Sequence, residues 1–168
     1  MTVTSKRRGV LVIGLGNELR HDDGAGVEIA RLLREPAERA GIEVREMQGE
    51  PLSLLDGWRH CGSLIVVDTM RSGAAPGTIR RIDVTDEPLP AMLDASSTHA
   101  VGIGEAIELA RTLDRLPPRV IVYAVEGRRF DAGLGLSEAL TAVVPKLATI
   151  VLDEARALAS VAHADVSF

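Results

Sequence analysis

The chain is poor in the residues that mark several classes of protein. Aromatic residues make up only 2% of its 168 residues, so we do not expect it to stack on single-stranded nucleic acid. The formal net charge of −5 also argues against a polyanion as partner. We therefore predict no nucleic-acid partner, and a core of leucine, isoleucine, valine and alanine.

Cysteine and long apolar runs are equally scarce. Cys61 is the only cysteine, which excludes a disulfide framework and a zinc site built from paired cysteines. The apolar run behind the basic lead 1–8 extends only from Gly9 to Ile13, which is too short for a signal peptide or a membrane span. We expect a protein of the reducing cytoplasm with no membrane partner.

No internal repeat, linker or low-complexity tract divides the sequence. Its length suits one domain over 1–168, with a core from about 9 to 160, that needs no structural metal to fold. The lack of a long heptad pattern favours a monomer.

Apolar periodicity predicts strands that alternate with helices. Strands are expected at 9–14, 42–47, 64–68, 78–84 and 120–124, and the fourth has the alternation of a half-exposed edge strand. Helices are expected from about 24 to Pro36, at 51–58, from His99 or Val101 to Leu113, and after a Ser137 cap with a break or kink at Pro145. This order predicts a three-layer α/β/α sandwich around a five-stranded, mainly parallel, twisted sheet with one antiparallel edge strand.

The most informative segment is the glycine-rich loop after the first predicted strand. Gly14 and Gly16 match the first two glycines of a dinucleotide-binding loop, but Leu19 stands at the third position. Asp22 and Asp23 then occupy the place of a phosphate, which they would repel. The loop therefore suits a cation, a proton transfer or a peptide.

Three polar residues are predicted at the carboxyl edge of the sheet, where α/β proteins bind their ligands. Asp23 lies in the loop after the first strand, Asp68 closes the third strand, and His99 begins the helix after the fourth. Two carboxylates and an imidazole at one crevice can form an open site for a divalent metal of borderline hardness.

Each of these residues also has a plain structural interpretation. Asp22 and Asp23 are suited to cap the helix that follows, and we favour a structural role for Asp22. Asp68 is suited to bind turn amides, and Asn17 to brace the loop through its side chain. From local sequence alone, these roles compete with catalysis.

The same segments, taken in order, carry a family resemblance. The run from Gly14 to Gly26, Val67-Asp68, Thr98-His99-x-x-Gly102 and Gly133-x-Gly135-Leu136-Ser137 together resemble the nickel-iron hydrogenase maturation endopeptidases. The resemblance extends from about residue 9 to about residue 155. It implies an endopeptidase that removes the C-terminal extension of the hydrogenase large-subunit precursor after nickel insertion.

The resemblance also implies roles for individual residues. Asp23, Asp68 and His99 correspond to the family's nickel-recognition site, with the nickel supplied by the substrate's own cluster. Asp23 or Asp68 would deprotonate the attacking water, unless the metal activates it. Asn17 and Glu126 are candidate substrate contacts, and no nucleotide cofactor is expected.

Two other functions compete with this interpretation. One is a nucleotide- or cofactor-binding module that uses the glycine loop, and the other is a noncatalytic chaperone that holds immature hydrogenase without cutting it.

Overall fold

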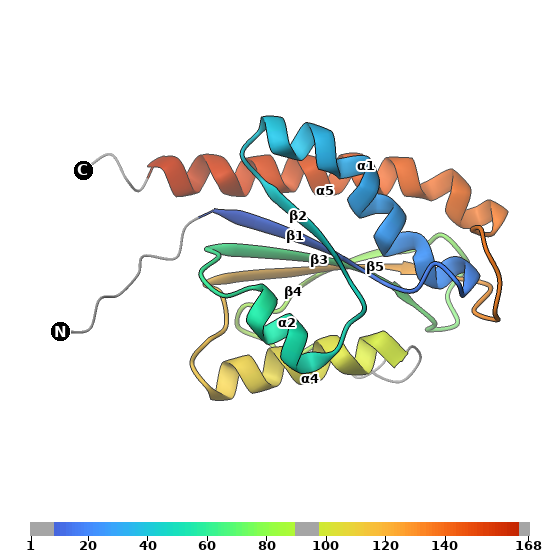
Figure 1. The fold of residues 1–168 in the computed structure, drawn as a ribbon, viewed down its shortest axis with the longest axis horizontal. Helices are drawn as coiled ribbons and strands as arrows, with labels where there is room; N and C mark the ends of the chain where they lie inside the picture. The colour runs from blue at the N-terminus through green and yellow to red at the C-terminus, as the bar shows by residue number, and fades with distance from the viewer. Residues whose placement is uncertain (1–8, 90–97, 165–168) are drawn as a thin grey trace.

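Five strands form one sheet in the order β2-β1-β3-β5-β4 (Figure 1). The computed structural model describes residues 9–89 and 98–164, without the side chains of 98–101 and 163–164. The strands are β1 (Val10–Leu15), β2 (Glu43–Met47), β3 (Ser63–Met70), β4 (Ile79–Asp83) and β5 (Arg119–Glu126). The first three and β5 run parallel, whereas β4 pairs antiparallel with β5 at one edge. This mixed sheet confirms the predicted strand count and the antiparallel edge strand.

Helices cover both faces of the sheet, as Figure 1 shows. The helices α1 (Ala25–Arg39) and α5 (Glu138–Ala164) pack on one face, where their aliphatic side chains meet Val12, Val67 and Val125. The helices α2 (Pro51–Gly57) and α4 (Thr98–Thr112) pack on the other face. Strand side chains alternate between the two faces of the sheet, and they are mostly apolar on each face. Both faces are therefore buried beneath helices. In the part of the chain that is described, no helix has the length and apolarity needed to cross a bilayer.

Several predicted boundaries were wrong by a few residues. The helix α1 continues past Pro36 to Arg39. The helix α5 is not interrupted at Pro145, and a kink there stays a prediction. A proline inside a helix removes one backbone N–H and so leaves one carbonyl without its helical hydrogen bond. For Pro36 this carbonyl belongs to Leu32, a half-exposed residue, where water can replace the lost hydrogen bond. The strand β3 extends two residues beyond Asp68, and β5 includes Glu126. Both strands gain length because they pair with each other as far as Met70 and Glu126.

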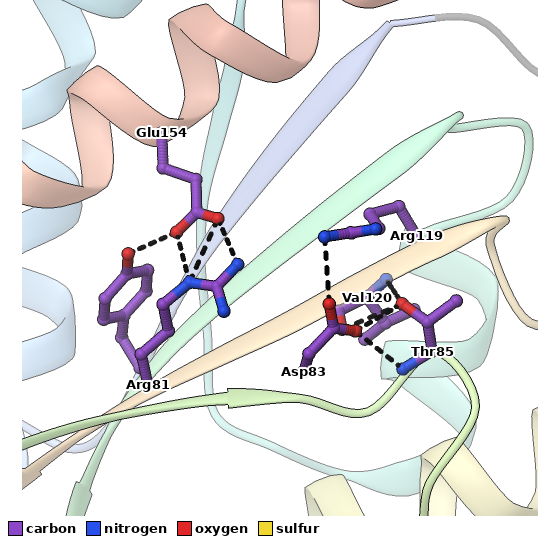
Figure 2. A network of polar contacts seen from close by, with 7 residues as sticks. Arg81, Asp83, Thr85, Arg119, Val120 and Glu154 are labelled. Carbon is purple, nitrogen blue, oxygen red and sulfur yellow. Dashed lines mark hydrogen bonds and ion pairs between the residues drawn. The ribbon is translucent and has the colours of Figure 1, made fainter.

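Ion pairs attach the antiparallel edge strand to its surroundings (Figure 2). The guanidinium of Arg81 on β4 donates to both carboxylate oxygens of Glu154 on α5, with a shortest distance of 2.6 Å. Tyr123 on β5 donates its hydroxyl to the same carboxylate. Asp83 accepts from the backbone N–H of Thr85 at 3.1 Å and pairs with Arg119 at 3.0 Å. These contacts hold β4 in place at the end of the sheet away from β2.

Candidate active site

The strand order reverses direction between β1 and β3. From β1 the chain goes outward to β2 on one side and then returns to β3 on the other. In open α/β sheets this switch point leaves a crevice beyond the carboxyl ends of the two strands. Asp23 lies in the short helix η1 (His21–Gly24), which follows β1, and Asp68 lies on β3. Both candidate catalytic residues therefore flank the switch point.

The glycines of the first loop allow the chain to pack closely over this point. A Cβ on Gly26 would lie 2.2 Å from the carbonyl oxygen of Leu15 and 2.6 Å from that of Val67. A Cβ on Gly16 would lie 1.9 Å from the carbonyl oxygen of Asp23. At these two positions the loop packs so closely against neighbouring backbone that only glycine fits.

Asp23 and Asp68 are both buried, although we expected them at the rim of a cleft. Their exposed fractions are 1% and 3%. The backbone carbonyl of Asp23 accepts from the N–H of Asn17 at 3.1 Å, so the loop closes on itself. Asp68 follows the alternation that places Leu64 and Val66 under α2 and α4, and one of its carboxylate oxygens accepts from the N–H of Thr69 at 2.8 Å.

His99 belongs to the first turn of α4, as the sequence predicts. Its side chain lies outside the described residues, but the next turn of the helix fixes where this end of α4 lies. A Cβ on Gly102 would lie 2.0 Å from the carbonyl oxygen of Gly49, which follows β2. The start of α4 is therefore at the carboxyl edge, on the face that Asp68 shares. Among the side chains that are described, no three of His, Cys, Asp and Glu gather to form a metal site.

Asp22 does not cap the helix after it, although capping was one of our interpretations. Neither η1 nor α1 has a side-chain cap. Instead the carboxylate accepts the backbone N–H groups of Arg128, Arg129 and Ser137 at 2.7, 2.9 and 2.6 Å, and the Ser137 hydroxyl at 2.8 Å. Burial acts to raise the pKa of Asp22, but these hydrogen bonds outweigh it, and the pKa lies below its ordinary value. The structural role that we favoured for Asp22 is confirmed.

Glu126 makes an equivalent connection to the loop after β3. It is 2% exposed, and its carboxylate accepts the backbone N–H groups of Ser72 and Gly73 at 3.0 Å and the Ser72 hydroxyl at 2.8 Å. Asp22 and Glu126 together connect the loops that follow β1, β3 and β5. Sequence reasoning missed this bracing function of Glu126, because the partners lie more than fifty residues away and no local pattern marks them.

Asn17 lies at a cleft and also braces its own loop. Its side-chain oxygen accepts the backbone N–H of Leu19 at 3.0 Å, as the structural interpretation predicts. The cleft, of about 300 Å³, opens beside the carboxyl ends of β1 and β2 and is lined by Asn17, Leu19, Arg31 and Met47 among others. A substrate contact by Asn17 stays a prediction, as does one by Glu126.

His21 adds a further connection between the first loop and the loop before α5. Arg129 donates from Nη2 to Nε2 of His21 at 3.1 Å, and a guanidinium can only donate, so Nε2 accepts. Nδ1 of His21, which lies 2.9 Å from the carbonyl oxygen of Gly135, therefore carries the proton. A Cβ on Gly133 would lie 2.1 Å from Nε2 of His21. A glycine at this position therefore leaves room for the imidazole ring.

The fold and the carboxyl edge of the sheet define the class of protein. It is an α/β/α sandwich with buried carboxylates on both sides of its switch point. The family model described as hydrogenase maturation protease matches residues 27–154, which include Asp68 and His99. The chain belongs to the hydrogenase maturation protease family.

Individual relatives agree with this assignment. The chain is 30% identical over 125 residues to the hydrogenase expression/formation protein HupD of Thiocapsa roseopersicina, and the match covers 73% of this chain and 56% of the relative. The hydrogenase maturating endopeptidase HybD from Escherichia coli superposes with a TM-score of 0.73 at 26% identity, over 88% of this chain and 92% of that one. HybD from Thermococcus kodakarensis, a [NiFe] hydrogenase maturation protease, gives a TM-score of 0.72 at 27% identity, over 88% and 99%.

Proposed function

We propose that this protein is an endopeptidase that removes the C-terminal extension of a nickel-iron hydrogenase large-subunit precursor. The observation that carries the proposal is that Asp23 and Asp68 flank one switch point in a member of the hydrogenase maturation protease family. The related HybD of Escherichia coli is itself described as a hydrogenase maturating endopeptidase.

Asp23 and Asp68 are our candidates for the proton transfer in peptide hydrolysis. A carboxylate can accept a proton from an attacking water and later return it to the leaving amine. The two side chains come from segments that pack against each other, since η1 contacts β3. This packing supports a joint role in one reaction.

We further propose that nickel acts as a recognition element that the precursor brings with it. The oxygen atoms of Asp23 and Asp68 and the imidazole of His99 are ligands that suit a divalent ion of borderline hardness. A metal already bound by the substrate would fix the scissile bond relative to the protease, so cleavage would wait for metal insertion. Asn17, at the cleft beside β1 and β2, is the candidate for contact with the peptide.

The reaction is proposed for the cytoplasm and for a single copy of the chain. The single cysteine and the lack of a heptad pattern are the features that support this.

The decisive experiment mixes the protein with nickel-loaded and nickel-free precursor and measures the product masses. We expect a shortened large subunit only with the nickel-loaded precursor. Asp23→Asn and Asp68→Asn keep the size of each buried side chain and should each abolish cleavage, with unfolding transitions close to wild type. A precursor that is bound but never cut by the wild-type protein would establish the chaperone alternative instead.

A further inference from the structure

Five polar or charged side chains are buried among the described residues, and all five lie at the carboxyl edge of the sheet. They are Asp22, Asp23, Asp68, Thr69 and Glu126. The first two belong to η1, which follows β1, the next two lie near the end of β3, and the last ends β5. Burying a polar group costs free energy unless the group is hydrogen-bonded, so each of these side chains needs an explanation.

Four of the five side chains already have a role. Asp22 and Glu126 connect loops through hydrogen bonds from backbone N–H groups. Asp23 and Asp68 are our candidates for proton transfer. Thr69, which is 1% exposed, is the remaining member, and its hydroxyl has no hydrogen-bond partner in the part of the chain that the structure describes.

The indole N–H of Trp58 also has no partner within residues 9–89 and 98–164, but it lies elsewhere in the fold. Trp58 follows the last turn of α2 and precedes β3, so it lies at the amino end of that strand, at the edge opposite to Asp23 and Asp68. It packs into the apolar cluster beneath α2 and α4. The hydroxyl of Thr69 is thus the group whose lack of a partner coincides with the candidate active site.

Thr69 is on the sheet face where η1 leads into α1. Because strand side chains alternate, Thr69 shares a face with Val67 and with its pairing partner Val125, and both valines belong to the apolar cluster beneath α1 and α5. The helix η1, which carries Asp23, contacts β3. Thr69 also follows Asp68 directly and donates its backbone N–H to that carboxylate at 2.8 Å. Thr69 is therefore adjacent to Asp68 in the chain and on the face to which the segment of Asp23 leads.

We infer that Thr69 is a further catalytic residue, whose hydroxyl donates a hydrogen bond to the carbonyl oxygen of the scissile peptide bond. This inference rests on the proposed function and adds a residue to it. In hydrolysis, water adds to the carbonyl carbon and negative charge develops on the carbonyl oxygen. A carboxylate takes the proton of the water and passes it to the amine as the C–N bond breaks.

The reaction needs a donor as well as a base. A carboxylate that acts as the base is ionised and can only accept hydrogen bonds, so another group must donate to the developing oxyanion. The hydroxyl of Thr69 can donate in this way, and it keeps its own proton throughout the reaction.

The surroundings of Thr69 suit this task. A donor stabilises a developing charge best when it is fixed in place and shielded from water. Thr69 is β-branched, so its side chain has little rotational freedom on the strand, and Val67 and Val125 shield it. It is buried to the same degree as Asp23 and Asp68, at 1% and 3%, so a scissile bond that reaches the carboxylates also reaches this hydroxyl.

The test removes this hydroxyl and compares the result with the removal of a hydrogen-bonded one. Thr69→Val keeps the shape of the side chain and loses its donor. Thr85→Val is the matched control, because the Thr85 hydroxyl donates to Asp83 at 2.6 Å and accepts the N–H of Val120 at 3.0 Å, near the amino end of β5. The measurements are kcat and KM for the nickel-loaded precursor over a range of pH, and the melting temperature of each variant.

We expect Thr69→Val to lower kcat by about a hundredfold and to change KM by less than about twofold. The loss should be the same at every pH, because threonine does not titrate. Its melting temperature should equal or exceed that of the wild type, since the hydroxyl that is removed has no partner. Thr69→Ser should recover most of kcat. Thr85→Val should show the opposite pattern, with a lower melting temperature and the kcat of the wild type.

Equal kcat values for the wild type and Thr69→Val would overturn the inference and leave the proposed function intact. A fall in melting temperature as large as that of Thr85→Val would overturn it too, because it would reveal a structural hydrogen bond. A shifted pH profile with the same maximal kcat would show that Thr69 acts on a carboxylate instead of the scissile carbonyl. A wild-type protein that leaves the nickel-loaded precursor uncut would refute the proposed function and this inference together.

Discussion

The carboxylate of Asp22 lies 2.6 Å from the backbone nitrogen of Ser137, a residue 115 positions later in the chain. This hydrogen bond joins the loop after β1 to the start of α5. The neighbouring Asp23 is thereby held at the end of β1, because its backbone lies between Asp22 and Gly26, which packs against β3. Of the two adjacent aspartates, Asp22 thus holds the loop, and Asp23 is the one that we propose for proton transfer.

Asp22→Ala should destabilise the protein by about 3–5 kcal/mol. Hydrogen bonds to a charged acceptor contribute about 1.5–3 kcal/mol each, and their loss is not fully additive. Urea unfolding followed by circular dichroism measures the change. Asp153→Ala, at an aspartate whose side chain is 70% exposed, is the control and should change stability by less than about 0.5 kcal/mol. A loss below about 1 kcal/mol for Asp22→Ala would contradict the bracing role.

Acid should remove the contribution of Asp22. Its pKa is lowered on folding, so its stabilisation is fully present above the unfolded value of about 3.9 and is lost as the pH falls through the lower native value. The stability difference between wild type and Asp22→Asn should therefore shrink as the pH is reduced from about 6 to 2.5. A difference that stays constant over this range would show that the charge of Asp22 is not what binds the loop.

Gly26→Ala should be one of the most damaging single-methyl changes in the chain. The added Cβ would meet backbone oxygen atoms of β1 and β3, which cannot rotate away, so we expect a loss of about 2–3 kcal/mol or failure to fold. Gly57→Ala is the control, because its Cβ would meet the flexible ends of two side chains, Met47 at 3.1 Å and Arg45 at 3.9 Å. Thermal unfolding compares the two. Similar melting temperatures for both variants would refute the close packing at the switch point.

Tyr123 on β5 is the only tyrosine in the sequence, so its pKa can be measured directly. Burial raises the pKa of Tyr123 to about 12, and the hydrogen bond to the Glu154 carboxylate adds to the effect. The stabilisation is present below the unfolded value of about 10 and is lost as the pH rises through about 12. Tyrosinate absorbance reports this residue alone, and Glu154→Gln should lower its pKa toward 10. A native tyrosine that titrates near 10 would contradict the network of Figure 2.

Much of the fold could be predicted because apolar periodicity is a local property. The run Leu64-Ile65-Val66-Val67 has no polar face, which indicates a strand covered on both sides, and α2, α4, α1 and α5 provide that cover. The boundaries were less predictable: β3 continues through Asp68 to Met70 because β5 offers it pairing partners, and pairing is not visible in either segment alone.

The candidate site was predictable in location but not in detail. Asp23, Asp68 and the first turn of α4 all come to the carboxyl edge because parallel strands end there. Their burial was not predicted, since it depends on how closely the glycine loop packs over β3. The partners of Asp22 and Glu126 were unpredictable for the same reason, as each lies on another loop.

The sequence by itself determined the kinds of element, their order and the residue types able to do acid–base or metal chemistry, because these follow from local periodicity and side-chain chemistry. Only the tertiary structure decided that Asp22 holds the loops while Asp23 lies at the switch point. Two adjacent carboxylates are chemically alike, and the bracing role of Asp22 arises from the N–H groups, more than a hundred residues distant, that the fold brings within hydrogen-bonding distance of it.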